Sequence, residues 1–358
     1  MNTYLNRLIL VLLIASGFKA TQAQDIHFSQ FYMSPLNLNP AMTGVMNCNT
    51  RFIANVRNQW AAVLGSNAYN TFSASFDKKV PVGRSDYFGI GGTLWGDVAG
   101  ASRFGTTQGR LSISYSKKMA GRRRSAHYLV FGADAGLSQR RISDGDLRWP
   151  NQITSNGFDP TIGGEAINDF NFLYPDLTAG LMWFSVLDEE TSWYVGAALA
   201  HVNTPNVSFL NSNDEGTSLF MKTTIHAGAQ LPMNKRVSIL PYGVILMQGE
   251  HREFNFGASA RFVMGPSIRA NQSWQFGMWY RLATQERALG NDEFETGIIS
   301  DALIFTTRID YDKFGIGLSY DLNVSELRAG GAGNGAFELS LIYQICGPEN
   351  RGVYCPKF

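Results

Sequence analysis

The residue types that most often catalyse reactions or bind metals are sparse in this chain. None of the histidines stands in a His-x-x-x-His or His-x-x-Glu-His spacing, and no Gly-x-Ser-x-Gly or P-loop motif occurs. The sequence therefore predicts no metal site, no cofactor and no catalytic residues. The five histidines are His27, His127, His201, His226 and His251.

One enzymatic alternative stays open at His226. It falls on a polar strand position beside Thr224 and Gln230, and a hydrolase built into a barrel could pair such a histidine with a serine. The simpler interpretation is a histidine that is hydrogen-bonded to its polar neighbours. We therefore expect a protein that is not an enzyme.

The three cysteines predict a disulfide, because residues 1–23 resemble an export signal and exported proteins reach an oxidising compartment. Cys346 and Cys355 flank a short Pro/Gly segment near the end of the chain, and a Cys346–Cys355 disulfide is one expectation. Cys48 would then be unpaired. Pairing of Cys48 with Cys346 or with Cys355 is the alternative.

A basic cluster falls on a turn between two predicted strands. Such a turn can dock an acidic periplasmic partner, or it can be a solvated turn that touches anionic lipid head groups. Both interpretations stay open. The cluster consists of Lys117, Lys118, Arg122, Arg123 and Arg124.

The composition separates this chain from most soluble proteins. Only 16% of its 358 residues are charged and the formal net charge is +1, whereas soluble domains carry roughly 25% charged residues. The balance also excludes a nucleic-acid partner, which would need a basic surface. Disorder is excluded by 13% aromatic residues.

Residues 1–23 read as a secretory signal peptide. Arg7 precedes an apolar run over residues 8–18, and the small-x-small site at residues 21–23 stands before Gln24. The apolar run is shorter than the roughly 20 residues that a membrane-spanning helix needs. We therefore expect an exported protein.

From Arg51 onward, apolar and polar residues alternate with a period of two, which is typical of strands. The segments have about nine to twelve residues, the length that a tilted strand needs to cross a bilayer. An even number of them returns the chain to its starting side. About fourteen occur, near residues 51–60, 70–78, 87–95, 106–116, 127–138, 176–184, 193–202, 223–231, 237–248, 252–263, 273–281, 302–311, 314–323 and 336–345.

The two faces of these strands favour a membrane. The apolar positions are bulky, whereas the polar positions are mostly small, and aromatic residues such as Trp193 and Tyr343 stand near the strand ends. This arrangement is typical of a transmembrane antiparallel β-barrel in outer-membrane lipid, with a polar lumen. A soluble exported β-sandwich is the alternative.

Loop lengths predict the orientation. We expect both termini in the periplasm, so that the long connections near residues 139–175, 203–222 and 282–301 face outward, as outer loops of such barrels do. These loops are candidates for an outer partner.

The segment 24–50 precedes the barrel (51–345), and a cysteine-containing tail (346–358) follows it. The segment is too apolar to stay extended in water, so we expect it to plug the barrel or to bind a periplasmic partner. Both locations stay open. Its candidate binding residues are Phe28, Phe31, Tyr32, Pro35, Leu38, Asn39 and Pro40.

This stretch resembles the PorP/SprF family of outer-membrane proteins from the type IX secretion and gliding-motility systems of Bacteroidetes. The resemblance continues through the barrel to the Cys-Pro-Lys-Phe tail. The matching pieces include residues 27–32, Pro35-Leu36, residues 38–41, Thr43-Gly44, residues 57–60, residues 73–77, residues 319–321 and residues 335–341.

The resemblance implies a non-enzymatic barrel that works with the type IX machinery and supports secretion or surface anchoring. It implies two kinds of partner: a periplasmic peptidoglycan-binding protein, and a secreted, adhesin-like surface protein with a C-terminal sorting domain. A porin or a channel for hydrophobic solutes is the alternative function. Tyr128, Phe184 and Trp279 could obstruct the lumen of such a channel.

Overall fold

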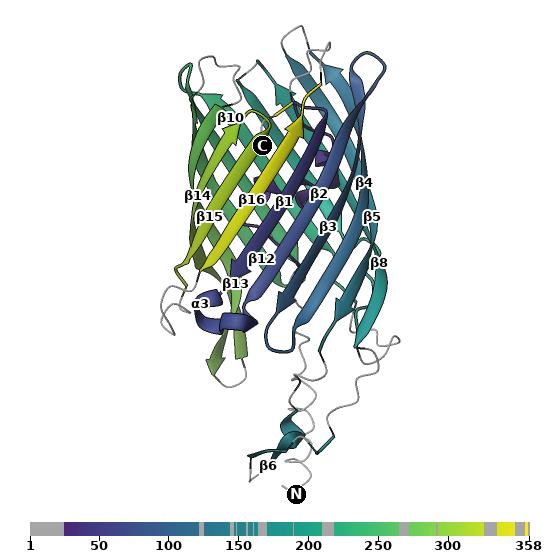
Figure 1. Ribbon diagram of the computed structural model, residues 1–358, viewed down its shortest axis with the longest axis vertical. Coiled ribbons are helices and arrows are strands. Elements are labelled where there is room, and N and C mark those ends of the chain that lie inside the picture. The colour runs from purple at the N-terminus through teal and green to yellow at the C-terminus, as the bar shows by residue number, and fades with distance from the viewer. Residues whose placement is uncertain are drawn as a thin grey trace, which may run out of the picture.

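Fourteen antiparallel strands close into a barrel in the computed structural model, in which the first strand pairs with the last (Figure 1). The predicted fold class is confirmed, and each of the fourteen predicted segments lies on one barrel strand. The structure describes residues 25–121, 125–143, 147, 149–154, 157–159, 161–163, 170–188, 190–209, 218–264, 272–290, 293–325, 335–347 and 355–356. The predicted signal peptide lies outside these residues.

The barrel consists of β1 (Thr50–Gln59), β2 (Tyr69–Val82), β3 (Asp86–Ala99), β4 (Phe104–Ala120), β5 (Ala126–Arg141), β8 (Asn171–Val186), β9 (Ser192–Ala200), β10 (Lys222–Pro232), β11 (Val237–Gln248), β12 (His251–Val263), β13 (Gln272–Gly290), β14 (Glu293–Tyr311), β15 (Phe314–Asn323) and β16 (Ala336–Ile345). Short elements lie before the barrel and in its connections. They are η1 (Phe31–Met33), α2 (Pro35–Leu38), η2 (Pro40–Met42), α3 (Ala61–Leu64), η3 (Gly65–Asn67), η5 (Pro150–Gln152), β6 (Ile153–Thr154) and β7 (Gly157–Phe158).

The barrel is apolar outside and polar inside. On β4, Leu111 and Ile113 are 77% and 62% exposed, whereas Arg110, Ser112 and Ser114 are buried. Apolar side chains outside and polar side chains inside are the reverse of the arrangement in a soluble protein, and they suit a wall that meets lipid. A closed barrel also satisfies its backbone hydrogen bonds without water. Among the described residues, no helix is both long and apolar enough to cross a membrane.

The two open ends of the barrel differ in their connections. We call the end with the β1–β2, β3–β4, β5–β8, β9–β10, β11–β12, β13–β14 and β15–β16 connections the long-loop mouth, and the other end the short-turn mouth. Connections at the short-turn mouth reach at most the eight residues 264–271, whereas β5 and β8 are separated by residues 142–170. The long-loop mouth is at the bottom of Figure 1.

One predicted loop is a pair of strands. We expected a loop over residues 282–301, but β13 and β14 continue pairing there up to Gly290 and Glu293. Their neighbours stop earlier, because β12 pairs with β13 only up to Ala283, and β15 pairs with β14 only from Ala302. The hairpin therefore projects beyond the wall, and no strand within the described residues pairs with either of its edges.

The N-terminal segment, residues 25–49, runs through the lumen from one mouth to the other. Asp25 contacts Gln248 and Lys222 at the long-loop mouth, and Asn49 bonds to Ile345 at the short-turn mouth. We expected both termini on one side of the membrane. The structure instead places Asp25 and Cys355 at opposite mouths, because the segment spans the barrel before β1 begins.

The disulfide expected between Cys346 and Cys355 is not the one observed. Cys346 pairs with Cys48, with Cα atoms 4.2 Å apart. The reason is barrel closure, because the β1–β16 pairing of Thr50 with Ile345 brings the flanking cysteines side by side. Cys355 is buried elsewhere, with its sulfur 3.6 Å from the hydroxyl of Tyr87.

The Cys48–Cys346 disulfide joins residues 298 positions apart and fixes the end of the N-terminal segment to the barrel seam. We predict that Cys48→Ser lowers the free energy of unfolding by about 2–4 kcal/mol, because the unfolded chain regains its freedom. Guanidinium titration of the detergent-solubilised barrel measures this. A reductant should destabilise the native protein and the Cys355→Ser control equally, and it should leave Cys48→Ser unchanged. Equal sensitivity of Cys48→Ser to the reductant would contradict the pairing.

Candidate functional site

The first anchor of the N-terminal segment is a buried charge network beside the β1–β16 seam. Arg57 Nη1 donates to Glu338 Oε1 at 2.8 Å and to Asp321 Oδ2 at 3.1 Å, and Arg281 Nη1 donates to the same Asp321 oxygen at 2.9 Å. The N-terminal segment completes the network, because the backbone N–H groups of Ser29 and Gln30 donate to Glu338. Charges this deeply buried are stable only when they are paired, so segment and wall depend on each other.

The second anchor is Asn39, in the middle of the lumen. Its side-chain nitrogen donates to the backbone carbonyls of Leu181 and Ala197, both at 3.2 Å, and lies 2.9 Å from Nε2 of His226. Glycine lets the segment approach this closely. A Cβ atom built on Gly180 would lie 2.0 Å from the Asn39 side-chain oxygen, and one on Gly132 would lie 2.3 Å from the backbone nitrogen of Ala41.

The third anchor lies toward the short-turn mouth. Asp77 accepts hydrogen bonds from the backbone of Gly44 and from the guanidinium of Arg51. Lys79 donates from Nζ to the carbonyl of Met46 at 3.0 Å. These bonds satisfy polar backbone groups of the segment that would otherwise be buried without partners.

Aromatic side chains fill the lumen between the anchors. Tyr32 of the segment stacks on Trp279 at 5.4 Å between ring centroids, and Trp279 stacks on Tyr242 at 5.9 Å. Tyr128 and Phe184 form a second stacked pair at 4.9 Å. Tyr128, Phe184 and Trp279 are almost fully buried, so the residues that we expected to obstruct the lumen do so together with the segment.

A fourth group holds the start of the segment at the long-loop mouth. Lys222 Nζ donates to Asp25 at 3.1 Å, and Nδ1 of His201 lies 2.9 Å from Asp176. Burial alone would lower the pKa of His201, but the hydrogen bond to Asp176 and the charge of Asp25, 3.6 Å from Nε2, raise this pKa to about 9. His201 is therefore charged at neutral pH and attracts Asp25.

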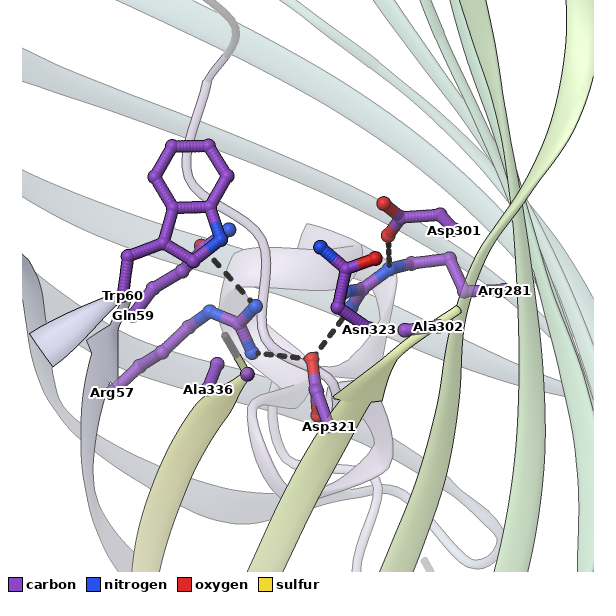
Figure 2. Close-up of a pocket in the computed structure, with 10 residues that line it drawn as sticks. Arg57, Gln59, Trp60, Arg281, Asp301, Ala302, Asp321, Asn323 and Ala336 are labelled. Atoms are coloured by element: carbon purple, nitrogen blue, oxygen red, sulfur yellow. Dashed lines mark hydrogen bonds and ion pairs between the residues drawn. The ribbon is translucent and has the colours of Figure 1, made fainter. Parts of the chain in front are cut away.

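A shallow pocket opens beside the first anchor at the long-loop mouth. Its volume is about 250 Å³, including the part that is open to solvent. Trp60 and Asp301 lie on opposite sides of it, with Arg57, Asp321 and Arg281 between them (Figure 2). The sequence predicted neither the pocket nor the charge network, because single charged residues on separate strands carry no signal of their pairing.

The structure places the candidate binding residues of the N-terminal segment inside the barrel. All seven are buried against the wall or against each other, where a partner has no access while the segment is in place. They are Phe28, Phe31, Tyr32, Pro35, Leu38, Asn39 and Pro40.

The basic cluster is only partly described. Lys117 and Lys118 lie at the end of β4, where Lys117 Nζ bonds to Asp86 at 2.9 Å on the surface. The expected contributions of Arg122, Arg123 and Arg124 lie outside the described residues.

The chemistry of the lumen is that of a packed core. The ring of His226 contacts Asn39, and within the described residues no serine is hydrogen-bonded to it. Within the described residues, no group of three or more His, Cys, Asp or Glu side chains could hold a metal ion. The site is arranged for holding the segment.

We predict that Arg57→Ala destabilises the barrel by about 3–5 kcal/mol, because it leaves Glu338 and Asp321 buried without their main counter-charge. Guanidinium titration of the solubilised full chain measures the change. The matched control is Lys117→Ala, which breaks the solvent-exposed surface pair with Asp86 and should leave the free energy of unfolding nearly unchanged. Similar small effects for both variants would contradict the role of the network.

Among solved structures, the CymD monoaromatic hydrocarbon channel is 11% identical, with a TM-score of 0.44 over 88% of this chain and 93% of that one. The transport unit of the autotransporter AIDA-I from Escherichia coli is 9% identical, with a TM-score of 0.35 over 90% of this chain and 100% of that one. Comparison with curated proteins gave no match.

The family comparison is decisive. The family described as type IX secretion system membrane protein PorP/SprF matches residues 20–343, which is nearly the whole chain. The resemblance seen in the N-terminal segment is thereby confirmed. The chain belongs to the PorP/SprF family of type IX secretion system membrane proteins.

Proposed function

We propose that this barrel is a sealed, non-enzymatic scaffold of the type IX secretion and gliding machinery in the outer membrane. The observation that supports this function best is the N-terminal segment, which occupies the lumen from one mouth to the other. A scaffold needs a rigid wall and two binding ends, whereas a channel needs a passage.

The packing of the lumen argues against the alternative of a porin or a hydrophobic-solute channel. Segment and wall are joined by buried ion pairs, by backbone hydrogen bonds and by stacked aromatic rings. Removing the segment would leave Glu338 and Asp77 without part of their hydrogen bonds. Opening a passage would therefore require several of these interactions to break together.

In this proposal, the long-loop mouth faces outward and binds a secreted, adhesin-like surface protein with a C-terminal sorting domain. The β13–β14 hairpin supports this assignment, because its two unpaired edges can accept a strand from a partner. The long β5–β8 connection offers further contact surface at the same mouth.

The short-turn mouth then faces the periplasm and docks a peptidoglycan-binding component. The turn after β4 supports this, because Lys117 and Lys118 stand there beside three further arginines of the sequence. Part of the cysteine-containing tail lies at the same mouth, where the backbone of Cys355 bonds to Asn47.

The test is affinity purification of the tagged, full-length barrel from native outer membranes, followed by identification of the proteins that accompany it. We expect type IX components and a large surface protein. Replacing residues 285–297 of the projecting hairpin by an Asn-Gly turn should remove the surface protein and retain the periplasmic component. Reversing the charges of Lys117 and Lys118 should have the opposite effect.

Two results would contradict the proposal. One is purification without any type IX component. The other is an unchanged set of partners in both variants, provided that each variant shows the heat-modifiable gel mobility of a folded barrel.

A further inference from the structure

We propose that the pocket at the long-loop mouth receives a basic side chain, an arginine or a lysine, from the protein that docks there. The inference rests on the proposed function in that it assigns the ligand to a partner at this mouth. It concerns the pocket between Trp60 and Asp301 and the charge network beneath it.

The arginine side chains around the pocket already have hydrogen-bond acceptors, whereas the carboxylates are not all paired. Both guanidinium groups are engaged: Arg57 donates to Asp321, Glu338 and Gln59, and Arg281 donates to Asp301 and Asp321. The network contains two arginines and three carboxylates. Its unmatched charge is negative, so the pocket favours a cation over an anion.

One carboxylate oxygen of the network lacks a hydrogen-bond donor among the described residues. Asp321 is 2% exposed and lines the pocket, and its Oδ1 atom has no hydrogen-bond partner among the residues that the structure describes. A buried carboxylate oxygen without a partner is costly. This uncompensated oxygen adds to the negative potential at the floor of the pocket, and that potential attracts a guanidinium or ammonium group.

Asp301 reaches the pocket because of a β-bulge. On β14 the buried positions alternate through Ile304 and Ala302, so regular pairing would turn Asp301 toward the outside of the barrel. The register shifts between Arg281 and Leu282 opposite Asp301, and this shift allows the carboxylate to bond to Arg281. A bulge that redirects a side chain is typical of binding sites. The Asp301 side chain remains 32% exposed, so a ligand can reach it.

Trp60 supplies an aromatic wall. It follows β1, and its ring meets Tyr69 edge-on at 5.1 Å between ring centroids, which fixes the indole at the rim. An indole opposite a carboxylate is the combination that binds a basic side chain best, because the cation interacts with the ring face and with the carboxylate at the same time.

The experiment follows the indole N–H signals of the solubilised full-length barrel by NMR while N-acetyl-arginine amide is added. The Trp60 signal is identified by its loss in Trp60→Phe. We expect this signal to shift with the arginine probe, and to respond about tenfold more weakly to N-acetyl-citrulline amide, which has the same shape without the charge.

Two variants test the carboxylates. Asp301→Asn should weaken binding of the arginine probe about tenfold, whereas Asn323→Asp should strengthen it, because Asn323 lines the pocket and an aspartate there can still accept from Ser325. Asp159→Asn, in the β5–β8 connection and outside the lining of the pocket, is the control and should leave binding unchanged.

Equal responses to the arginine and citrulline probes, or no response of Trp60 in the native protein and in Asn323→Asp, would overturn the inference. These outcomes are independent of the proposed function, because the purified barrel is tested without any partner. If type IX components still accompany the native barrel, only the assignment of the pocket has failed.

Discussion

The structure depends on filling a lumen that the wall cannot fill alone. Eight strands make a barrel whose own side chains fill it, and fourteen strands make a wider one. Here the chain supplies the missing volume from its own N-terminal segment, which brings apolar side chains such as Phe31 and Leu36 into the interior. The polar lining of the wall then has to be paired with this segment or left buried at high cost.

The contacts of Arg57 and Glu338 with the N-terminal segment couple the filling of the lumen to the closure of the barrel. Arg57 belongs to the first strand and Glu338 to the last, and they face each other across the seam. Ser29 and Gln30 bond to the same carboxylate, so the segment binds at the place where the barrel closes. The Cys48–Cys346 disulfide fixes the other end of the segment to the same seam. A barrel built in this way has a rigid interior, and its variable surfaces lie at its mouths.

The strands could be predicted from the sequence because a period of two is a local property. Phe256, Phe262 and Met278 stand on exposed faces, as the alternation indicates. The projecting part of the β13–β14 hairpin was missed because strands beyond the membrane need no apolar face, and polar residues such as Gln285-Glu286-Arg287 resemble a loop. Asp301 was missed because a bulge breaks the alternation on which the prediction rests.

The site itself could not be predicted, because its pairings are long-range. Arg57 and Glu338 lie 281 residues apart, and the residues of each pair become neighbours only when the barrel closes. The same holds for Cys48 and Cys346, which the spacing of the cysteines alone did not pair. The apolar character of the N-terminal segment did indicate that it must be buried, but the choice between lumen and partner required the contacts of Asn39 and Ser29 with the wall.

Single-channel recording in planar bilayers tests most directly whether the N-terminal segment seals the barrel. The native full-length protein should insert without a stable open current at neutral pH. A large, stable conductance of the native barrel, with the Cys48–Cys346 disulfide intact, would contradict the sealed lumen and would favour a channel.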